Sequence, residues 1–231
     1  MSISEWSDPN LADTYAGKAA DPAVNWFEYE VNVPAMLAIM PSGAQHVLDF
    51  GCGAGDVTTM LADRYPKVEG CDPSAAMLEH ARHDFPGLTF FTWDATQPLP
   101  DKQGYYDAVF SKLALHFVPD LRPVASNLFG VLGEGGSLVF SVPHPFSTVK
   151  KTPDANYWQQ ASYQTPIGSY GVQVTMIHRS LEEYIAPFTE AGFVLTTCHE
   201  PRIPADIAHQ NNAAASELAA PKRLNIRLTK P

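Results

Sequence analysis

The chain has 231 residues, a length that suits one domain with an elaborated rim. With 45% hydrophobic residues and only 17% charged residues, it has enough apolar material for a packed core, which argues against disorder. The net charge of −10 repels polyphosphates and anionic lipids, so we expect no nucleic-acid and no membrane partner.

The N-terminus and the cysteines indicate the compartment. Three acidic residues and no apolar run occupy the first 13 positions, so we expect no secretory leader. A transmembrane helix is not expected either, because no run of 18 apolar residues occurs. The chain has an odd number of cysteines, three, at Cys52, Cys71 and Cys198, and they lack the spacing of zinc ligands. These features predict a cytoplasmic protein with reduced thiols and no metal site.

The first two segments of the chain have different patterns. Residues 1–40 carry aromatic side chains ahead of the first strand, which predicts an N-terminal lid over the carboxyl edge of a sheet. Residues 41–142 alternate short apolar runs with amphipathic stretches, as in a parallel sheet flanked by helices. The predicted strands are Val47–Phe50, Val68–Cys71, Leu88–Thr92, Ala108–Ser111 and Ser137–Val142, and the predicted helices are Gly55–Tyr65, Ser74–Asp84 and Asp120–Leu132.

The alternation stops after residue 142. Residues 143–179 hold aromatic residues without a clear helical period, which predicts an insertion on the substrate side. Residues 180–231 contain a predicted helix at Leu181–Ala191 and predicted strands at Phe193–Cys198 and Leu224–Thr229. The last strand alternates apolar and polar residues, which fits an antiparallel strand near an edge of the sheet. We therefore predict a single α/β domain, 1–231, with a doubly wound, mostly parallel sheet.

A glycine-rich turn follows the first strand. Residues 49–55 read Asp-Phe-Gly-Cys-Gly-Ala-Gly. A dinucleotide site of the Gly-x-Gly-x-x-Gly kind requires glycine at position 56, where this chain has Asp56. Carboxylates at Asp49 and Asp56 would repel a pyrophosphate and would tolerate positive charge. The turn therefore predicts a nucleoside ligand without phosphates.

The next two strands also end in acidic residues. Asp72 is placed to accept both hydroxyls of a ribose. Asp94 is placed to reach an adenine amino group, and the amide of Ala95 a ring nitrogen, while Pro73 and Leu113 sandwich the ring. Ligands of open α/β sheets bind at the carboxyl ends of strands, so we expect three strand ends to converge on one adenosine.

In their order along the chain, these motifs resemble those of the class I S-adenosylmethionine-dependent methyltransferases, and most closely the small-molecule branch often labelled type 11. The motifs that carry the resemblance are Asp49 to Gly55, Asp72-Pro73-Ser74 with Met77-Leu78, Asp94-Ala95, Tyr106 to Phe110 with Leu115-His116-Phe117, and Leu132 to Gly136. The likeness is strong from Leu37 to Val142 and looser in the flanks. It implies an enzyme with a seven-stranded Rossmann-like sheet whose last strand is antiparallel.

The resemblance also implies the cofactor and its site. The cofactor is S-adenosyl-L-methionine, and the by-product is S-adenosyl-L-homocysteine. The residues expected to bind it are Asp49, Gly51, Cys52, Gly53, Asp72, Met77, Asp94 and Ala95, to which we add Pro73, Ser111 and Leu113. Two positions depart from the family's pattern, namely Trp93, where glycine is common, and Lys112, where a small polar residue is usual.

Candidate catalytic and substrate residues lie outside these motifs. His116 and His144 follow the fourth and fifth strands, and histidine suits the removal of a proton from an acceptor near neutral pH. Alignment of the reactants without a base is the alternative. The aromatic residues expected to contact the substrate are Tyr15, Trp26, Tyr29 and Tyr157. An aromatic roof of this kind suits a planar or apolar acceptor.

The sequence therefore predicts methyl transfer to an oxygen, nitrogen or carbon nucleophile of a small metabolite, aromatic or apolar in character, in secondary metabolism. Two alternatives remain open. One is a methyltransferase that acts on tRNA or protein, and the other is a module that binds the cofactor without turnover. We expect a monomer or a homodimer.

Overall fold

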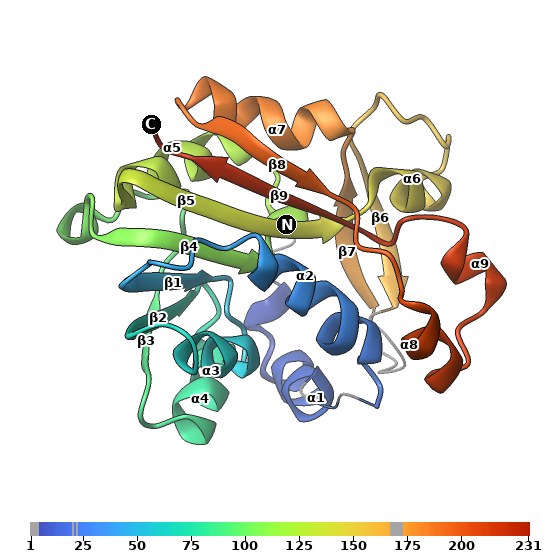
Figure 1. Ribbon diagram of the computed structural model, residues 1–231, viewed down its shortest axis with the longest axis horizontal. Helices are drawn as coiled ribbons and strands as arrows, with labels where there is room; N and C mark the ends of the chain where they lie inside the picture. The colour runs from blue at the N-terminus through green and yellow to red at the C-terminus, as the bar shows by residue number, and fades with distance from the viewer. Residues whose placement is uncertain (1–4, 20, 22, 167–172) are drawn as a thin grey trace.

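The computed structural model describes residues 5–19, 21, 23–166 and 173–231. Its centre is a seven-stranded sheet with the order β3-β2-β1-β4-β5-β9-β8 (Figure 1). The strands are β1 His46–Phe50, β2 Lys67–Asp72, β3 Thr89–Thr92, β4 Tyr106–Lys112, β5 Leu132–Pro143, β8 Val194–His199 and β9 Arg223–Thr229. The pairs among β1 to β5 are parallel, and β9 is antiparallel to both of its neighbours. The predicted fold class is thus confirmed.

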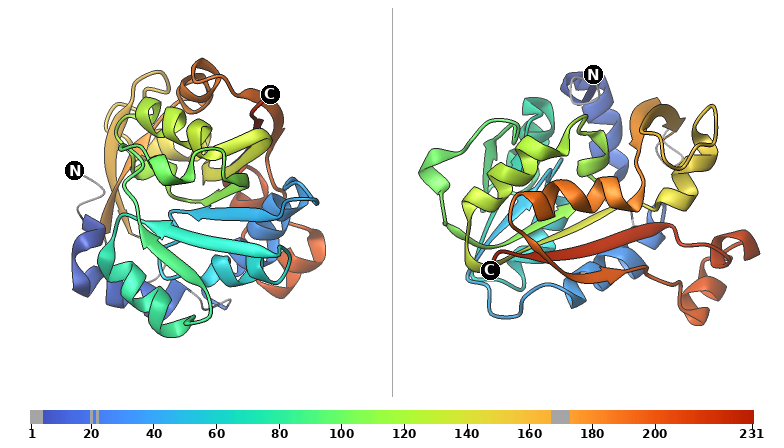
Figure 2. Two further views of the ribbon diagram at one scale, coloured as in Figure 1. Left: turned by 90° about the vertical axis from the view of Figure 1, so that its left-hand side faces the viewer. Right: turned by 90° about the horizontal axis from the view of Figure 1, so that it is seen from above.

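Helices cover both faces of this sheet (Figures 1 and 2). The helices are α2 Val33–Ala38, α3 Asp56–Ala62, α4 Ala75–Asp84, α5 Leu121–Val131 and α7 Leu181–Glu190. Successive side chains of a buried strand point to opposite faces. In β1, Leu48 therefore joins the core beneath α5 and α7, whereas Val47 joins the core beneath α2 and α3. This two-sided burial explains the nearly continuous apolar runs in the parallel strands.

The insertion contains regular structure that the sequence did not predict. It comprises α6 Pro145–Thr148, the 3₁₀ turn η5 Val149–Lys151 and an antiparallel pair, β6 Ala161–Pro166 with β7 Gln173–His178. The burial of β6 alternates along the strand, but its inward residues are Tyr163 and Thr165, so hydropathy gives little signal. Two short helices, α8 Ala205–Gln210 and α9 Ala215–Leu218, are further additions. In Figure 1 the insertion and these helices lie beyond the carboxyl ends of β4 and β5.

The N-terminal segment is anchored at that same end of the sheet. It contains η1 Glu5–Ser7, α1 Pro9–Ala19 and the π-helix η2 Phe27–Asn32. The Ser74 hydroxyl donates to the Trp6 carbonyl over 2.5 Å, which ties η1 to the start of α4. On the other side, the Glu5 carboxylate accepts hydrogen bonds from the Thr175 amide at 3.0 Å and hydroxyl at 2.8 Å. The segment therefore bridges the core and the insertion.

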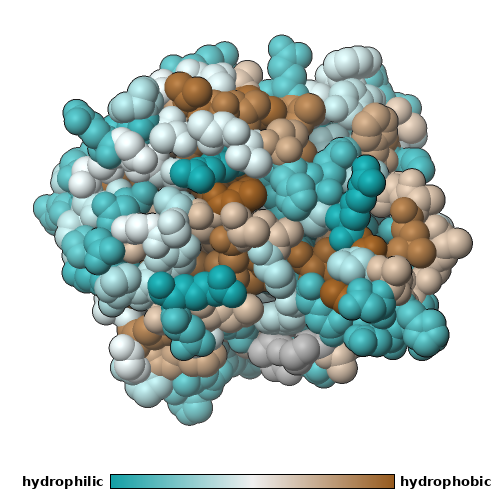
Figure 3. Space-filling view, viewed as in Figure 1, coloured by the Kyte–Doolittle hydropathy of each residue, from teal (hydrophilic) through white to brown (hydrophobic). Residues whose placement is uncertain are grey.

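The surface of the molecule is mixed in polarity. Figure 3 shows apolar surface over α7 and β8, at the edge of the sheet where Val194 and Leu195 are exposed. Among the helices of the described residues, none has the length and apolar character needed to cross a membrane. Two 3₁₀ turns complete the fold, η3 Pro100–Lys102 and η4 Leu115–Phe117, and the second of these lies beside the cavities described next.

Candidate active site

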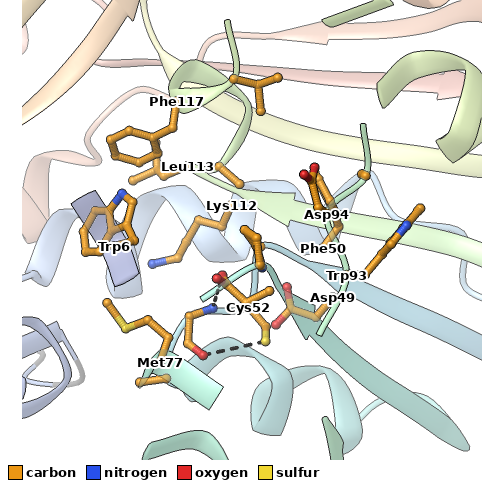
Figure 4. A pocket seen from close by; sticks show the side chains of 18 of the residues that line it. Trp6, Asp49, Phe50, Cys52, Met77, Trp93, Asp94, Lys112, Leu113 and Phe117 are labelled. Carbon is orange, nitrogen blue, oxygen red and sulfur yellow. Dashed lines mark hydrogen bonds between the residues drawn. The ribbon is translucent and has the colours of Figure 1, made fainter. Parts of the chain in front are cut away.

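A cavity opens at the carboxyl ends of β1 to β4, beneath the N-terminal segment (Figure 4). We call it the cofactor cavity. Its lining includes all of the predicted cofactor residues except Ser111, namely Asp49, Gly51, Cys52, Gly53, Asp72, Pro73, Met77, Asp94, Ala95 and Leu113. The four strand ends thus converge on one space, as parallel topology requires.

Ser111 does not line this cavity, so the structure does not bring it together with the other predicted cofactor residues. It lies within β4, is fully buried, and its hydroxyl has no hydrogen-bond partner among the described residues. The next residue, Lys112, lines the cavity instead. The reason is the alternation of side chains along a strand, which gives neighbouring residues opposite orientations.

The glycine turn has the backbone geometry that its sequence implies. Gly51, Gly53 and Gly55 all have positive φ values, of 72°, 54° and 90°. A Cβ atom at Gly51 would lie 2.3 Å from the Cβ of Ala114, so no larger residue fits there. A Cβ at Gly53 would meet nothing within 4 Å. Gly53 therefore presents bare main chain to the open cavity, where a ligand can approach closely.

Gly53→Ala is expected to weaken binding of S-adenosylhomocysteine severalfold, because the added methyl group occupies space beside the cavity wall. Gly104→Ala is a matched control, since Gly104 has a φ of +64°, a Cβ atom there would also meet nothing within 4 Å, and the residue does not line the cavity. Both variants are expected to lose about 1 kcal/mol of stability from backbone strain. Calorimetric titration checks the difference, and equal affinities for the two variants would contradict it.

Buried carboxylates give the cofactor cavity its electrostatic character. Asp49 accepts a hydrogen bond of 2.7 Å from the Thr58 hydroxyl, and burial raises its pKa to about 7. Asp72 accepts hydrogen bonds from the amides of Gly53, at 3.0 Å, and Ser74, at 2.9 Å, yet burial raises its pKa to about 6. Burial also raises the pKa of Asp56. A positively charged ligand would offset the cost of keeping these buried carboxyls ionised. The sulfonium and ammonium groups of the expected S-adenosylmethionine carry such charge.

Aromatic residues close the cavity in places that motif analysis missed. Trp6 lines it, with its ring 5.0 Å from that of Tyr15 and 5.4 Å from that of Phe117. Trp93, the departure from the family's glycine, also lines it and donates its indole N–H to the Gln97 carbonyl over 2.9 Å. No spacing rule points to Trp6, because only the tertiary fold brings the N-terminus to the strand ends.

A second cavity adjoins the first and shares Trp6, Tyr15, Lys112, Leu113 and Phe117 with it. We call it the acceptor cavity. Its remaining lining comes from η2 and the residues just before it, from η4, the end of β5, α6, η5, the β6–β7 pair, α9, and the residues that lead into the start of β9. Four of its residues are cationic, Lys112, Lys151, Lys222 and Arg223, and two are carboxylates, Glu28 and Glu217. This basic lining contrasts with the net charge of −10 for the whole chain.

The cations of the acceptor cavity differ in their partners. Arg223 forms an ion pair with Glu28, and Lys222 forms one with Glu217. Within the part of the chain that the structure describes, neither Lys112 nor Lys151 has a carboxylate within 4 Å. Figure 4 shows the Lys112 side chain extending into the space near Trp6 and Met77.

The predicted substrate residues divide into two groups. Tyr15 and Trp26 line the acceptor cavity. Tyr29 does not line it, although the Lys112 ammonium lies 5.8 Å from the centre of its ring. Tyr157 is also absent from the lining, so the structure does not place it with Tyr15 and Trp26. Its hydroxyl accepts a hydrogen bond of 3.1 Å from the Leu181 amide, and its ring packs against Trp158.

The two candidate histidines have different surroundings. His116 lines the acceptor cavity and is 2% exposed, and neither ring nitrogen has a partner among the described residues. Burial and the charges of Arg223 and Arg179 lower its pKa to about 3. His144 lines neither cavity, so the structure lends no support to its predicted catalytic role. It caps α6 by accepting the Phe146 amide at 3.2 Å, and its Nε2 lies 2.7 Å from Glu200.

Comparisons with known proteins agree with this geometry. Residues 47–136 match a family model described as a methyltransferase domain. The trans-aconitate 2-methyltransferase of Paracidovorax citrulli is 32% identical over 181 residues, which are 75% of this chain and 70% of that protein. The protein of the same name from Methylobacterium radiotolerans is 38% identical over 122 residues, which are 51% of this chain and 46% of that protein.

A solved structure is similar over most of the chain. The S-adenosylmethionine-dependent methyltransferase from Mesorhizobium loti is 25% identical, with a TM-score of 0.68. The alignment covers 85% of this chain and 96% of the other.

Proposed function

The chain belongs to the S-adenosylmethionine-dependent methyltransferases, and from this premise we propose that it methylates a carboxylate oxygen of a small organic acid. S-adenosylmethionine is the methyl donor of the family. The observation that carries the proposal is the acceptor cavity, where two lysines have no carboxylate within 4 Å among the described residues. Burial acts to raise the pKa of Glu28, Asp49 and Asp56, and at longer range the charge of Lys112 acts to lower it. The names of the relatives support it, because trans-aconitate is an acid with three carboxyl groups.

Lys112 has the central place in this proposal because it lines both cavities. S-adenosylmethionine, when bound, supplies a methyl group made electrophilic by its sulfonium. The Lys112 ammonium would hold the acceptor carboxylate where the two cavities meet, with one of its oxygens toward the methyl group. The C–O bond forms as the C–S bond breaks, and the electron pair stays on sulfur. The chain thus contributes alignment and the exclusion of water by Trp6 and Phe117.

The acceptor cavity holds no strong general base among its described residues. Its two carboxylates, Glu28 and Glu217, are each paired with a cation, and both have a lowered pKa. His116 is the one histidine of that lining, and a pKa of about 3 makes it a poor proton acceptor at neutral pH. Burial raises the pKa of Tyr163 to about 12, so its hydroxyl stays protonated. A carboxylic acid is already ionised at neutral pH and needs no base. This favours a carboxylate over a phenol or an amine, and an anion over the apolar acceptor expected from the aromatic residues.

The proposal is tested by incubating the protein with methyl-labelled S-adenosylmethionine and a panel of acids that includes trans-aconitate. A methyl ester releases labelled methanol on mild alkaline treatment, whereas methylated amines and phenols do not. We expect alkali-labile label in the small-molecule filtrate. Alkali-stable product, or label retained on RNA or protein from a cell extract, would favour the alternatives. A reaction without the protein serves as the blank.

Lys112→Met is expected to lower kcat/KM for the acid about tenfold or more, because a charge-assisted hydrogen bond contributes about 1.5–3 kcal/mol. Its effect on S-adenosylhomocysteine affinity is expected to be smaller. Lys150→Met is the control, since Lys150 is exposed and lines neither cavity. Steady-state kinetics with both substrates varied check this, and an unchanged KM and kcat for the acid would exclude the role given to Lys112.

A further inference from the structure

The place where the two cavities meet is lined mainly by aromatic residues. The residues that line both cavities are Trp6, Tyr15, Lys112, Leu113 and Phe117. A methyl group that passes from donor to acceptor must leave the cofactor cavity and enter the acceptor cavity. The sulfur that carries this methyl group is therefore expected among these shared residues.

The three shared aromatic rings stand at steep angles to one another. The Trp6 ring lies 5.0 Å from the Tyr15 ring at an interplanar angle of 77°, and 5.4 Å from the Phe117 ring at 79°. They come from η1, α1 and η4, so only the tertiary fold brings them together. Rings at such angles form the walls of a corner and not a flat stack. Aromatic cages of this kind bind quaternary ammonium groups.

This aromatic corner lies away from the expected adenine end of the cofactor. Figure 4 shows Trp6 and Phe117 on one side of the pocket, and Trp93 and Asp94 on the other. Asp94 is the residue expected to contact adenine. The sulfur of the cofactor is attached to the ribose on the opposite side from adenine, so it would extend toward the corner.

Trp6 is held at the corner by hydrogen bonds of its own turn. Its carbonyl accepts the Ser74 hydroxyl over 2.5 Å, and the preceding Glu5 carboxylate accepts two hydrogen bonds from Thr175. The indole nitrogen of Trp6 is buried, whereas the residue lines both cavities. The ring therefore meets the cavities with its carbon surface.

The charges around the junction leave the attraction of a cation to these rings. Lys112 is the charged residue among the five, and its ammonium would repel a sulfonium. Within the described part of the chain, no carboxylate lines both cavities, and Asp49, Asp72 and Asp94 line the cofactor cavity alone. The face of an aromatic ring carries the negative part of its quadrupole and attracts a cation.

We propose that Trp6, Tyr15 and Phe117 form an aromatic cage for the sulfonium, which lets the protein bind the charged methyl donor more tightly than the neutral by-product. This inference goes beyond the proposed function, because it concerns the donor side of the reaction and holds for any acceptor. When the methyl group leaves, the electron pair of the broken C–S bond stays on sulfur and the positive charge is lost. The cage then holds the by-product less strongly, which favours its exchange for fresh donor.

The test compares charged and neutral ligands by calorimetric titration without an acceptor. The charged ligands are S-adenosylmethionine and sinefungin, which has an ammonium group in place of the methyl group on sulfur, and the neutral one is S-adenosylhomocysteine. Trp6→Leu is expected to weaken binding of both charged ligands about five- to tenfold, and of S-adenosylhomocysteine less than about twofold. Trp6→Phe keeps an aromatic face and is expected to recover most of the loss. Trp158→Leu is the control, since Trp158 is exposed and lines neither cavity.

A second variant covers the case in which Trp6→Leu fails to fold. Phe117→Leu is expected to weaken binding of the two charged ligands about threefold, again with a smaller effect on S-adenosylhomocysteine. Equal losses for charged and neutral ligands, with no recovery in Trp6→Phe, would overturn the cage and leave these rings as walls of the cavity. Since no acceptor is present, that result leaves carboxyl methylation standing. Conversely, a failure to methylate any acid leaves the cage standing.

Discussion

Asp72→Ala is expected to weaken the binding of S-adenosylhomocysteine at least tenfold at pH 7.5 while the chain keeps its fold. Asp72 lies at the end of β2, where its carboxylate holds the amides of Gly53 and Ser74 and lines the cofactor cavity. The carboxylate has further lone pairs for the two ribose hydroxyls, and each charge-assisted hydrogen bond contributes about 1.5–3 kcal/mol. Calorimetric titration measures the affinity, and thermal unfolding reports the fold.

Asp101→Ala is the control for this variant, because Asp101 is an exposed acid outside both cavities. It removes the same unit of charge from the chain and is expected to bind the ligand as the parent does. The contrary outcome is an Asp72→Ala variant that unfolds cooperatively at nearly the parent temperature and still binds S-adenosylhomocysteine with the parent's affinity. That result would contradict the expected contact between Asp72 and the ribose.

Asp49→Asn is expected to make the free protein more stable at pH 8 and to weaken cofactor binding. The folded pKa of Asp49, about 7, lies above its ordinary value of 3.8 because the carboxyl is buried. The stability that Asp49 contributes is therefore fully present below pH 3.8 and is lost as the pH rises through 7. Asparagine carries no charge and can still accept the Thr58 hydroxyl, so it avoids this loss.

The measurement is the unfolding temperature of both proteins between pH 5 and pH 8, without ligand. We expect the advantage of Asp49→Asn to grow with pH and to reach several degrees at pH 8, since about 1 kcal/mol shifts the Tm of a chain of this size by roughly 2–4 °C. The parent's affinity for S-adenosylmethionine is expected to fall below pH 7, when Asp49 becomes protonated. A difference in unfolding temperature that does not change with pH would contradict the raised pKa of Asp49.

The sequence predicted many of the residues that line the cofactor cavity, because the signals for them are local. Each strand end and the turn that follows it lie within a few residues of each other, and the parallel topology then places Asp49, Asp72 and Asp94 along one edge. Ser111 lies outside the cavity lining for a local reason as well, since a shift of one residue along β4 reverses the direction of the side chain.

The acceptor side was not predictable in the same way. Lys112, Lys151 and Arg223 belong to three separate segments, and their proximity depends on how the insertion and β9 pack. His144 follows β5 directly, so topology alone puts it near the expected acceptor. Its ring instead caps α6 and pairs with Glu200. Neither composition nor spacing separates a histidine that faces a cavity from one that holds a turn. Only the tertiary contacts make this distinction.

The most direct test of carboxyl methylation is a crystal structure of the protein with S-adenosylhomocysteine and a dicarboxylic acid. We expect the adenosine over Asp72 and Asp94, and a carboxylate of the acid at Lys112, next to the sulfur. A structure that places the acid outside the acceptor cavity, or that seats it with no carboxylate at Lys112, would contradict the proposal.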